Sequence, residues 1–255
     1  MTEAKLVEGV PRHQTVRSVV KATHLLLRIA DSSGMTAADA AREVGIPLTT
    51  AYHLLNTLLA EGMLTRDSAR RYGLGPKIAS LSVAYARSGP SEQLLNAVRN
   101  LAEATGETAY LSGWRNGQVV ALAIIEGSSA VRVGRIHAEL RGFEHARASG
   151  KLMLAHLDDS ALSSYLDTHE LEALTPTTIT DKDTLRAQLA DIRRVGHSFD
   201  EAEFIEGVGC VAAPILEGDT CYGCLTISAP LDRFRKGRRV LTEAVEAAAQ
   251  RESRR

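Results

Sequence analysis

The pattern of apolar residues in the N-terminal quarter of the chain predicts three helices. Apolar residues recur at near-helical spacing from Val16 to Ala30, and a turn-forming Asp-Ser-Ser-Gly sequence follows them. A second, shorter helix is expected from Thr36, whose side chain is a good N-cap, to Glu43. A third helix is expected to begin with Pro47 just inside its first turn, where proline is tolerated, and to run to Glu61.

The second and third helices together have the spacing of a helix-turn-helix. A small residue, Ala41, stands where the two helices would cross, and Gly45 supplies the left-handed residue that the turn needs. The motif spans Ala37 to Asn56. Apolar residues occupy the positions at which such helices pack together, namely Ala40, Val44, Ile46, Ala51 and Leu54.

A basic hairpin is expected directly after the third helix, because two short extended segments, residues 63–66 and 71–74, surround a polar loop. This order is typical of a winged helix, which places one helix in the major groove and the hairpin on phosphates. One such domain binds weakly alone, so a homodimer that reads a palindromic operator in double-stranded DNA is expected. The residues expected to contact DNA are Thr36, Pro47, Leu48, Thr49, Thr50, Tyr52, His53, Arg70 and Arg71, with the two arginines on phosphates.

The composition changes at the Gly-Pro step of positions 89 and 90, which predicts a domain boundary. The expected order is a flexible tail (1–15), a winged helix-turn-helix domain (16–75), a linker helix (76–88) and an α+β domain (89–255) with helices on an antiparallel sheet. In the last domain, strands are expected at 107–114, 118–125, 130–137, 210–216 and 222–229. Helices are expected at 94–102, 149–156, 159–166, 183–195 and 233–250.

The composition is that of a globular protein of ordinary kind. The 255 residues are 44% hydrophobic and 24% charged, which excludes a disordered or fibrous chain. The net charge of −1 divides into +4 over residues 1–88 and −5 over the rest, so the basic excess lies in the predicted DNA-binding part. The longest apolar run has seven residues, against roughly 20 for a membrane span. With no secretory signal and three cysteines, a cytoplasmic protein with reduced thiols is expected.

The helix-turn-helix and wing carry a family resemblance. The chain reads GIPLTTAYHLLNTLLAEGMLTRDSARRYGLG, which resembles the recognition helix and wing of the IclR (isocitrate-lyase-regulator) family of bacterial transcription regulators. Later stretches agree in order, among them HARASGKLMLAHL, LTPTTITDKDTL, RRVGHSFDEAEFIEGVGCVAAPI and LTISAPLDRF. The resemblance implies a GAF-like C-terminal effector domain, dimers often paired into tetramers, and activation or repression of genes in response to a small organic acid, aliphatic or aromatic.

The resemblance also implies where the effector binds. The residues carried over are Ala148, Ser149 and Gly150 of one loop, together with Asp200, Cys210, Thr226 and Ser228. Their chemistry is compatible with this role, because Ser149 and Gly150 begin a predicted helix whose N–H groups attract a carboxylate. Three departures stand out. Phe143 and Glu144 precede His145 where a Pro-Leu pair is common in the family. His53 replaces an arginine that many members have in the recognition helix, and Arg147 replaces a small residue in the effector loop.

Three other chemistries compete with this interpretation. A phosphate loop at Gly150-Lys151 is rejected, since His145 and Leu152 stand where that motif needs glycine and serine or threonine. Cysteines 221 and 224 have a zinc-like spacing, but Cys210 is the only other cysteine, so histidines would have to complete the four ligands. A metabolite-binding hydrolase built on Cys210 with His145 or His197 is the remaining alternative. The predicted protein is a regulator, not an enzyme, and is expected to need no cofactor or metal.

Overall fold

A computed structural model describes residues 15–32, 34–115, 117–134 and 142–253. The chain divides into two compact units, of which the first ends at Gly89 and the second begins at Pro90. The predicted flexible tail lies almost entirely outside the described residues.

The N-terminal unit is helical with one small hairpin. Its elements are α1 (Arg17–Ala30), α2 (Ala37–Val44), α3 (Leu48–Ala60), β1 (Leu64–Arg66), β2 (Tyr72–Leu74) and α4 (Pro76–Ser88). The side chains that α2 and α3 turn inward meet those of α1 and the hairpin in a single apolar core, in which Leu25, Ala40, Ala51 and Leu55 are fully buried. Each predicted helix-turn-helix packing position belongs to this core.

Local chemistry explains where α2 begins and ends. The Asp39 N–H donates to Thr36 Oγ1 at 3.3 Å, as expected of an N-cap, and the Thr36 hydroxyl donates to the Asp39 carboxylate at 2.6 Å. Gly45 ends the helix with a φ of 67°, a left-handed conformation that favours glycine. Pro47 was expected in the first turn of the third helix, and this expectation is wrong by one position. It is the N-cap of α3 and has extended backbone, so the helix starts at Leu48.

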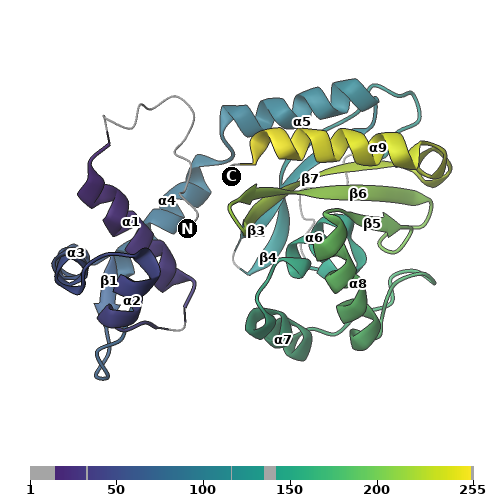
Figure 1. Ribbon diagram of the computed structural model, residues 1–255. Coiled ribbons are helices and arrows are strands. Elements are labelled where there is room, and N and C mark those ends of the chain that lie inside the picture. Colours follow the sequence, from purple (N-terminus) through teal and green to yellow (C-terminus); the bar gives the residue numbers. More distant parts are fainter. Residues whose placement is uncertain (1–14, 33, 116, 135–141, 254–255) are drawn as a thin grey trace. The chain divides into compact units, whose positions relative to one another are not determined.

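The C-terminal unit is an antiparallel sheet with helices on both faces (Figure 1). Its helices are α5 (Glu92–Thr105), the short 3-10 helix η2 (Glu144–Ala146), α6 (Ala148–Ala155), α7 (Asp159–Thr168), α8 (Lys182–Val195) and α9 (Leu231–Glu252). Its strands are β3 (Thr108–Arg115), β4 (Gln118–Ile125), β5 (Ser198–Glu201), β6 (Val208–Glu217) and β7 (Thr220–Pro230). The strand order is β4-β3-β7-β6-β5.

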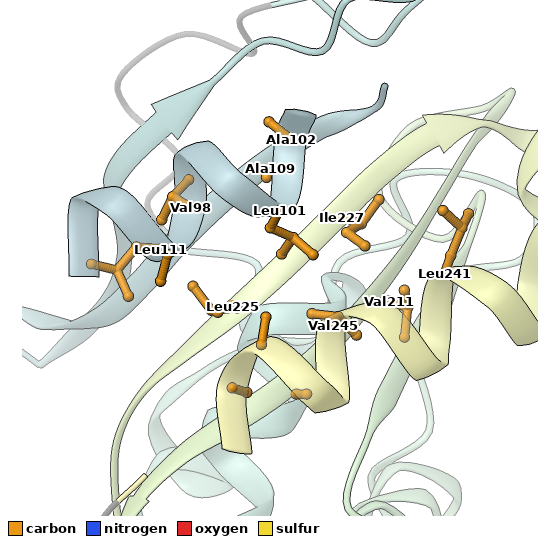
Figure 2. Packing of buried hydrophobic residues seen from close by; sticks show 14 of the residues in the cluster. Val98, Leu101, Ala102, Ala109, Leu111, Val211, Leu225, Ile227, Leu241 and Val245 are labelled. Atoms are coloured by element: carbon orange, nitrogen blue, oxygen red, sulfur yellow. The ribbon is translucent and has the colours of Figure 1, made fainter. Parts of the chain in front are cut away.

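Strand alternation separates two cores. Odd-numbered residues of the central strands, such as Val211 of β6 and Ile227 of β7, pack against α5 and α9 (Figure 2). Even-numbered neighbours, such as Ala212 and Cys224, pack against α6, α7 and α8 on the opposite face. The predicted effector residues of the strands are even-numbered, so they lie on the face that α6 covers.

Three elements differ from the sequence-based expectation. The strand predicted over 130–137 is wrong for residues 130–134, which are irregular, and its remainder lies outside the described residues. Side chains, in place of a neighbouring strand, provide hydrogen-bond donors for two backbone carbonyls of this segment. Thr108 Oγ1 donates to the Val133 carbonyl, and the Arg233 guanidinium donates to the Val131 carbonyl. Strand β5 and helix η2 were not predicted, since each has at most four residues and no clear periodicity.

Candidate functional site

The outer face of α3 carries most of the side chains predicted to contact DNA. Leu48 and Tyr52 are 43% and 46% exposed, and Thr49 and His53 are exposed beside them. Thr50 differs from its neighbours, because it is half-buried and has less surface to offer to a base. Because Ala51 and Leu55 on the opposite side are fully buried in the core, the orientation of α3 is fixed by packing.

The hairpin after α3 has the form of a wing with an ordered tip. Strands β1 and β2 pair antiparallel, with Leu64 opposite Leu74. Asp67 organises the loop between them, since its carboxylate accepts the Arg71 N–H at 2.8 Å and its carbonyl accepts the Arg70 N–H at 3.1 Å. Arg70 has a positive φ of 59° and an exposed side chain at this turn.

The two predicted phosphate contacts are not equivalent. The guanidinium of Arg71 lies against Gly34, because a Cβ atom added at that glycine would be 3.1 Å from Arg71 Nε. Arg71 therefore also packs at the base of the wing. Arg66, in β1, lies 5.9 Å from the centre of the Tyr72 ring, which is within the range of a cation-π contact. Arg70 is thus the better candidate for a phosphate contact at the tip.

In the C-terminal unit, the predicted effector residues of the sheet form one cluster. Asp200 of β5 pairs with Cys210 of β6, and Cys210 pairs with Ser228 of β7, so these residues form a row across three strands. Thr226 lies two residues before Ser228 on the same face of β7, and it pairs with Tyr110 of β3. The Cys210 Sγ and Ser228 Oγ atoms are 2.9 Å apart. Sequence reasoning did not find Tyr110, whose hydroxyl is buried on the same face.

The predicted loop residues begin helix α6 above this cluster. Ala148, Ser149 and Gly150 form its first turn, and the Cys224 thiol of β7 lies 4.0 Å from the Ser149 carbonyl oxygen. Gly150 has a packing role, because a Cβ atom there would lie 2.3 Å from the backbone carbonyl oxygen of Glu144. Only glycine allows η2 and α6 to approach so closely. Every predicted effector residue is buried, either in the first turn of α6 or on the sheet face that α6 covers.

A buried ion pair, missed in the sequence, lies beside the row. The ammonium group of Lys151, fully buried, contacts the two carboxylate oxygens of Glu203 at 2.5 and 2.6 Å. Thr175 and Thr178 donate to backbone carbonyls at Ala202 and Glu203, and so hold the segment after β5 in place. A lysine inside the apolar run of α6 was the available signal, since a buried lysine needs a counterion.

Asp200 is an unusual acid. Its Oδ1 atom accepts the N–H groups of Glu203 and Phe204 at 2.8 and 3.3 Å. Burial of the carboxyl and, to a smaller extent, the charge of Glu203 raise the pKa of Asp200 from its ordinary value of 3.8 to about 7. The charge of Lys151 opposes this shift in pKa. Asp200 is therefore partly protonated near neutral pH and can then donate a hydrogen bond.

A second buried ionic group lies at the start of α6, one turn before Lys151. The carboxylate of Glu144 accepts the Val119 N–H at 3.1 Å and the Tyr165 hydroxyl at 3.0 Å. The guanidinium of Arg147 lies 3.8 Å from the same carboxylate and donates to the Val119 carbonyl at 2.7 Å. The sequence singled out Glu144 and Arg147 only as departures from the family, and it did not indicate Tyr165.

The geometry gives no support to the hydrolase alternative. A cysteine nucleophile needs a lowered pKa and a histidine within hydrogen-bond reach. Burial instead raises the pKa of Cys210 well above its ordinary value. His145 Nε2 contacts the Glu172 carbonyl at 3.0 Å, and His197 Nδ1 contacts Glu246 at 2.7 Å. In the described part of the chain, no group of three or more His, Cys, Asp or Glu residues could hold a metal ion.

Two surface cavities lie away from the effector cluster. The first has a volume of about 540 Å³ and lies between β5 and the basic first half of α9, where Phe199, Arg235 and Lys236 are among its lining residues. The second, of about 430 Å³, lies between α5 and the end of α9. Neither contains a residue that the sequence predicted to bind an effector.

Comparison with known proteins decides the family. The family model for the IclR helix-turn-helix domain matches residues 18–68, and that for the bacterial transcriptional regulator IclR C-terminal domain matches residues 91–254. The chain belongs to the IclR family. The regulator is 33% identical to the HTH-type transcriptional regulator BhcR of Paracoccus denitrificans over 92% of this chain and 85% of that protein. It is 28% identical to the transcriptional repressor IclR of Escherichia coli over 89% of this chain and 85% of that protein.

Solved structures agree with this assignment. An IclR transcriptional regulator from Alicyclobacillus acidocaldarius is 25% identical and matches with a TM-score of 0.60, over 94% of this chain and 98% of that one. The IclR-family chain is therefore a DNA-binding transcriptional regulator with a C-terminal effector domain. Among the helices of the described residues, none has the length and apolar character needed to cross a membrane.

Proposed function

We propose that this regulator binds a palindromic operator as a homodimer and that a small carboxylic acid, bound in its C-terminal unit, changes its affinity for DNA. The observation that carries the DNA-binding part is the exposed polar face of α3 next to a wing whose tip presents Arg70. A packed helix with exposed threonine, tyrosine and histidine side chains can reach base edges, while a tip arginine can neutralise a phosphate.

Exposed apolar residues support the homodimer. Val16, Val19 and Leu27 of the α1 region are 56–62% exposed, and Leu81 and Val83 of α4 are 56% and 58% exposed. Apolar side chains gathered on the helices of a small unit mark a surface for another protein. A second copy of the same unit would cover them and would present a second α3 to the next half-site. A pairing of two such dimers is also part of the proposal.

Buried hydroxyl groups support an effector site on the α6 side of the sheet. The hydroxyls of Tyr110, Ser198 and Thr226 are buried and have no hydrogen-bond partner among the described residues. Such groups are usually satisfied, so a ligand with several oxygen atoms fits this position. An IclR homologue from Microbacterium hydrocarbonoxydans has been solved in complex with 4-hydroxybenzoate, so an aromatic acid is among the ligands to test first.

Replacing Arg70 with alanine tests the DNA-binding part. We expect Arg70→Ala to weaken binding to all DNA sequences by a similar factor, because a phosphate contact carries no sequence information. The slope of log affinity against log salt should become shallower by about 0.9 for each phosphate that the variant no longer neutralises. Fluorescence anisotropy with a labelled operator and with a scrambled duplex, each over a series of salt concentrations, measures both quantities.

Arg194→Ala is the matched control, since Arg194 is an exposed arginine of α8 in the other unit, paired with Asp191. It should leave the affinity and the salt slope unchanged. A change in sequence preference in Arg70→Ala would show that Arg70 reads a base, and an unchanged salt slope would show that the wing does not touch phosphate.

A further inference from the structure

A basic segment near the start of α9 contrasts with the acidic unit that contains it. Residues 233–239 read Arg-Phe-Arg-Lys-Gly-Arg-Arg, so five of these seven positions are basic, whereas residues 89–255 together carry a net charge of −5. Arg233 is engaged by Glu107. The other four basic side chains line the cavity of about 540 Å³ between β5 and α9, namely Arg235, Lys236, Arg238 and Arg239.

This cavity lies on the opposite face of the sheet from the effector cluster. Phe199, in its wall, is an odd-numbered residue of β5 and packs against the core between the sheet and α9. Asp200, the next residue, points to the α6 side. Strand β5 ends the strand order, so within the described residues no further strand covers this edge. The cavity is therefore separate from every residue predicted to bind the effector.

Aromatic packing holds one of the guanidinium groups in place. The guanidinium carbon of Arg238 lies 3.9 Å from the centre of the Phe199 ring, which is a close cation-π contact. That ring packs edge-on against the fully buried Phe234, with ring centres 6.1 Å apart, and also contacts the His197 ring. Arg238 has thus already lost part of the side-chain freedom that an ordinary exposed arginine loses when it binds an anion.

Two of the guanidinium groups share one carboxylate. Glu201 accepts from Arg235 Nε at 3.4 Å and from Arg238 Nη1 at 2.6 Å. The three side chains are 29–59% exposed, and exposed ion pairs contribute only about 0–1 kcal/mol to stability. A phosphate group carries about two negative charges and three acceptor oxygens, so it can compete with Glu201 for both guanidinium groups.

The other acids near the cavity leave a surplus of positive charge. Glu243 pairs with Arg239 at 2.7 Å, whereas Glu246 contacts His197 Nδ1 at 2.7 Å. Among the described residues, the four cations of the wall are therefore paired with two carboxylates, and Lys236 adds an exposed ammonium group. The volume of the cavity is within the usual range for small-ligand sites, and neighbouring arginines suit the bidentate recognition of phosphate.

We propose that this cavity is a second ligand site, which binds a small molecule carrying a phosphate group through Arg235 and Arg238. The inference goes beyond the proposed function, because it depends neither on the class of the effector nor on the DNA-binding face of α3. It also gives Glu201 a role, since this carboxylate holds the two arginines side by side and is displaced from them by the phosphate.

Calorimetric titration of the full-length protein with inorganic pyrophosphate, at low ionic strength, tests the site. We expect one pyrophosphate to bind per chain. The double variant Arg235→Gln with Arg238→Gln should weaken this binding about 10-fold or more, because two charge-assisted contacts are lost. Glu201→Gln should tighten binding about twofold or more, because a competing carboxylate is removed. Damage to the fold would not increase the affinity.

The double variant Arg193→Gln with Arg194→Gln removes two exposed charges from α8 and is the matched control, which should bind pyrophosphate as the wild type does. The site is overturned if the wild type binds no pyrophosphate at millimolar concentration. It is also overturned if both double variants lose the same affinity, or if Arg235→Gln with Arg238→Gln binds normally. Should that variant not fold, an unchanged affinity in Glu201→Gln would equally overturn it.

Two further measurements separate a small ligand from DNA. The affinity of Arg235→Gln with Arg238→Gln for a labelled duplex, and its salt slope, should equal those of the wild type. A shallower slope would show that the basic segment contacts the DNA backbone, which overturns the small-molecule site. Arg70→Ala should bind pyrophosphate normally, and a loss there would place the anion on the wing instead. Each of these failures leaves the proposed function intact.

Discussion

Replacing Lys151 with methionine is expected to lower the free energy of unfolding by about 3–5 kcal/mol. Lys151 is fully buried, and its ammonium group contacts the carboxylate of Glu203 at 2.5 Å. Without that cation, Glu203 must either remain charged in an apolar setting or take up a proton, and burial already raises the pKa of Glu203. Urea unfolding of the full-length protein at neutral pH, followed by circular dichroism, measures the decrease.

Two further variants separate the ion pair from general damage to the core. Lys182→Met, at the exposed start of α8, should change stability by less than about 0.5 kcal/mol. The double variant Lys151→Met with Glu203→Gln should recover part of the stability, because it removes both charges of the pair. A Lys151→Met protein as stable as Lys182→Met, or a double variant with fully additive destabilisation, would contradict the importance of the pair.

Replacing Asp200 with asparagine is expected to change how stability depends on pH. The pKa of Asp200 is about 7 in the folded protein and 3.8 as its ordinary value, so between these values the folded state holds a proton that the unfolded state has released. The contribution of Asp200 to the stability of the wild type therefore falls as the pH rises from about 4 to about 7, by about 4 kcal/mol in total. Asparagine cannot ionise and keeps the oxygen that accepts two backbone N–H groups.

The comparison of wild type and Asp200→Asn therefore has a definite sign. From pH 5 to pH 8, the stability of Asp200→Asn relative to the wild type should rise by about 3 kcal/mol. Asp219→Asn, which changes an exposed carboxyl in the turn between β6 and β7, should show no such trend. Thermal or urea unfolding at four pH values provides the measurement, and parallel pH profiles for wild type and Asp200→Asn would show that Asp200 is not a buried acid.

Local signals in the sequence were sufficient to predict the N-terminal unit. The Thr36 cap, the left-handed Gly45 and the spacing of Ala41 and Ala51 act within a few residues of one another, so the pattern contains almost everything that the geometry uses. The polar loop before Tyr72 predicted the hairpin in the same way. Only the finer exposure of Thr50 and the packing of Arg71 on Gly34 depend on three-dimensional contacts.

The C-terminal unit depends more on contacts that are distant in sequence. Alternation and helix signals predicted most of its helices and strands. However, the strand register that aligns Asp200, Cys210 and Ser228 cannot be predicted from the local sequence of any one of the three strands. Those residues came from the family resemblance. The pairing of Lys151 with Glu203 spans 52 positions, and no local rule connects them. The irregular segment at 130–134 was mistaken for a strand because its alternating valines resemble one.

Helix α3 is expected to read bases in duplex DNA, and a binding selection tests this expectation. Purified full-length protein is mixed at low ionic strength with sheared genomic DNA of the organism that encodes it, and the enriched fragments are then titrated against scrambled duplexes of equal composition. The enriched fragments should share an inverted-repeat motif that the wild type binds at least about 10³-fold more tightly than the scrambled duplex, and His53→Ala should show a weaker preference. Equal binding of motif and scrambled DNA, or no binding to any fragment, would contradict this expectation.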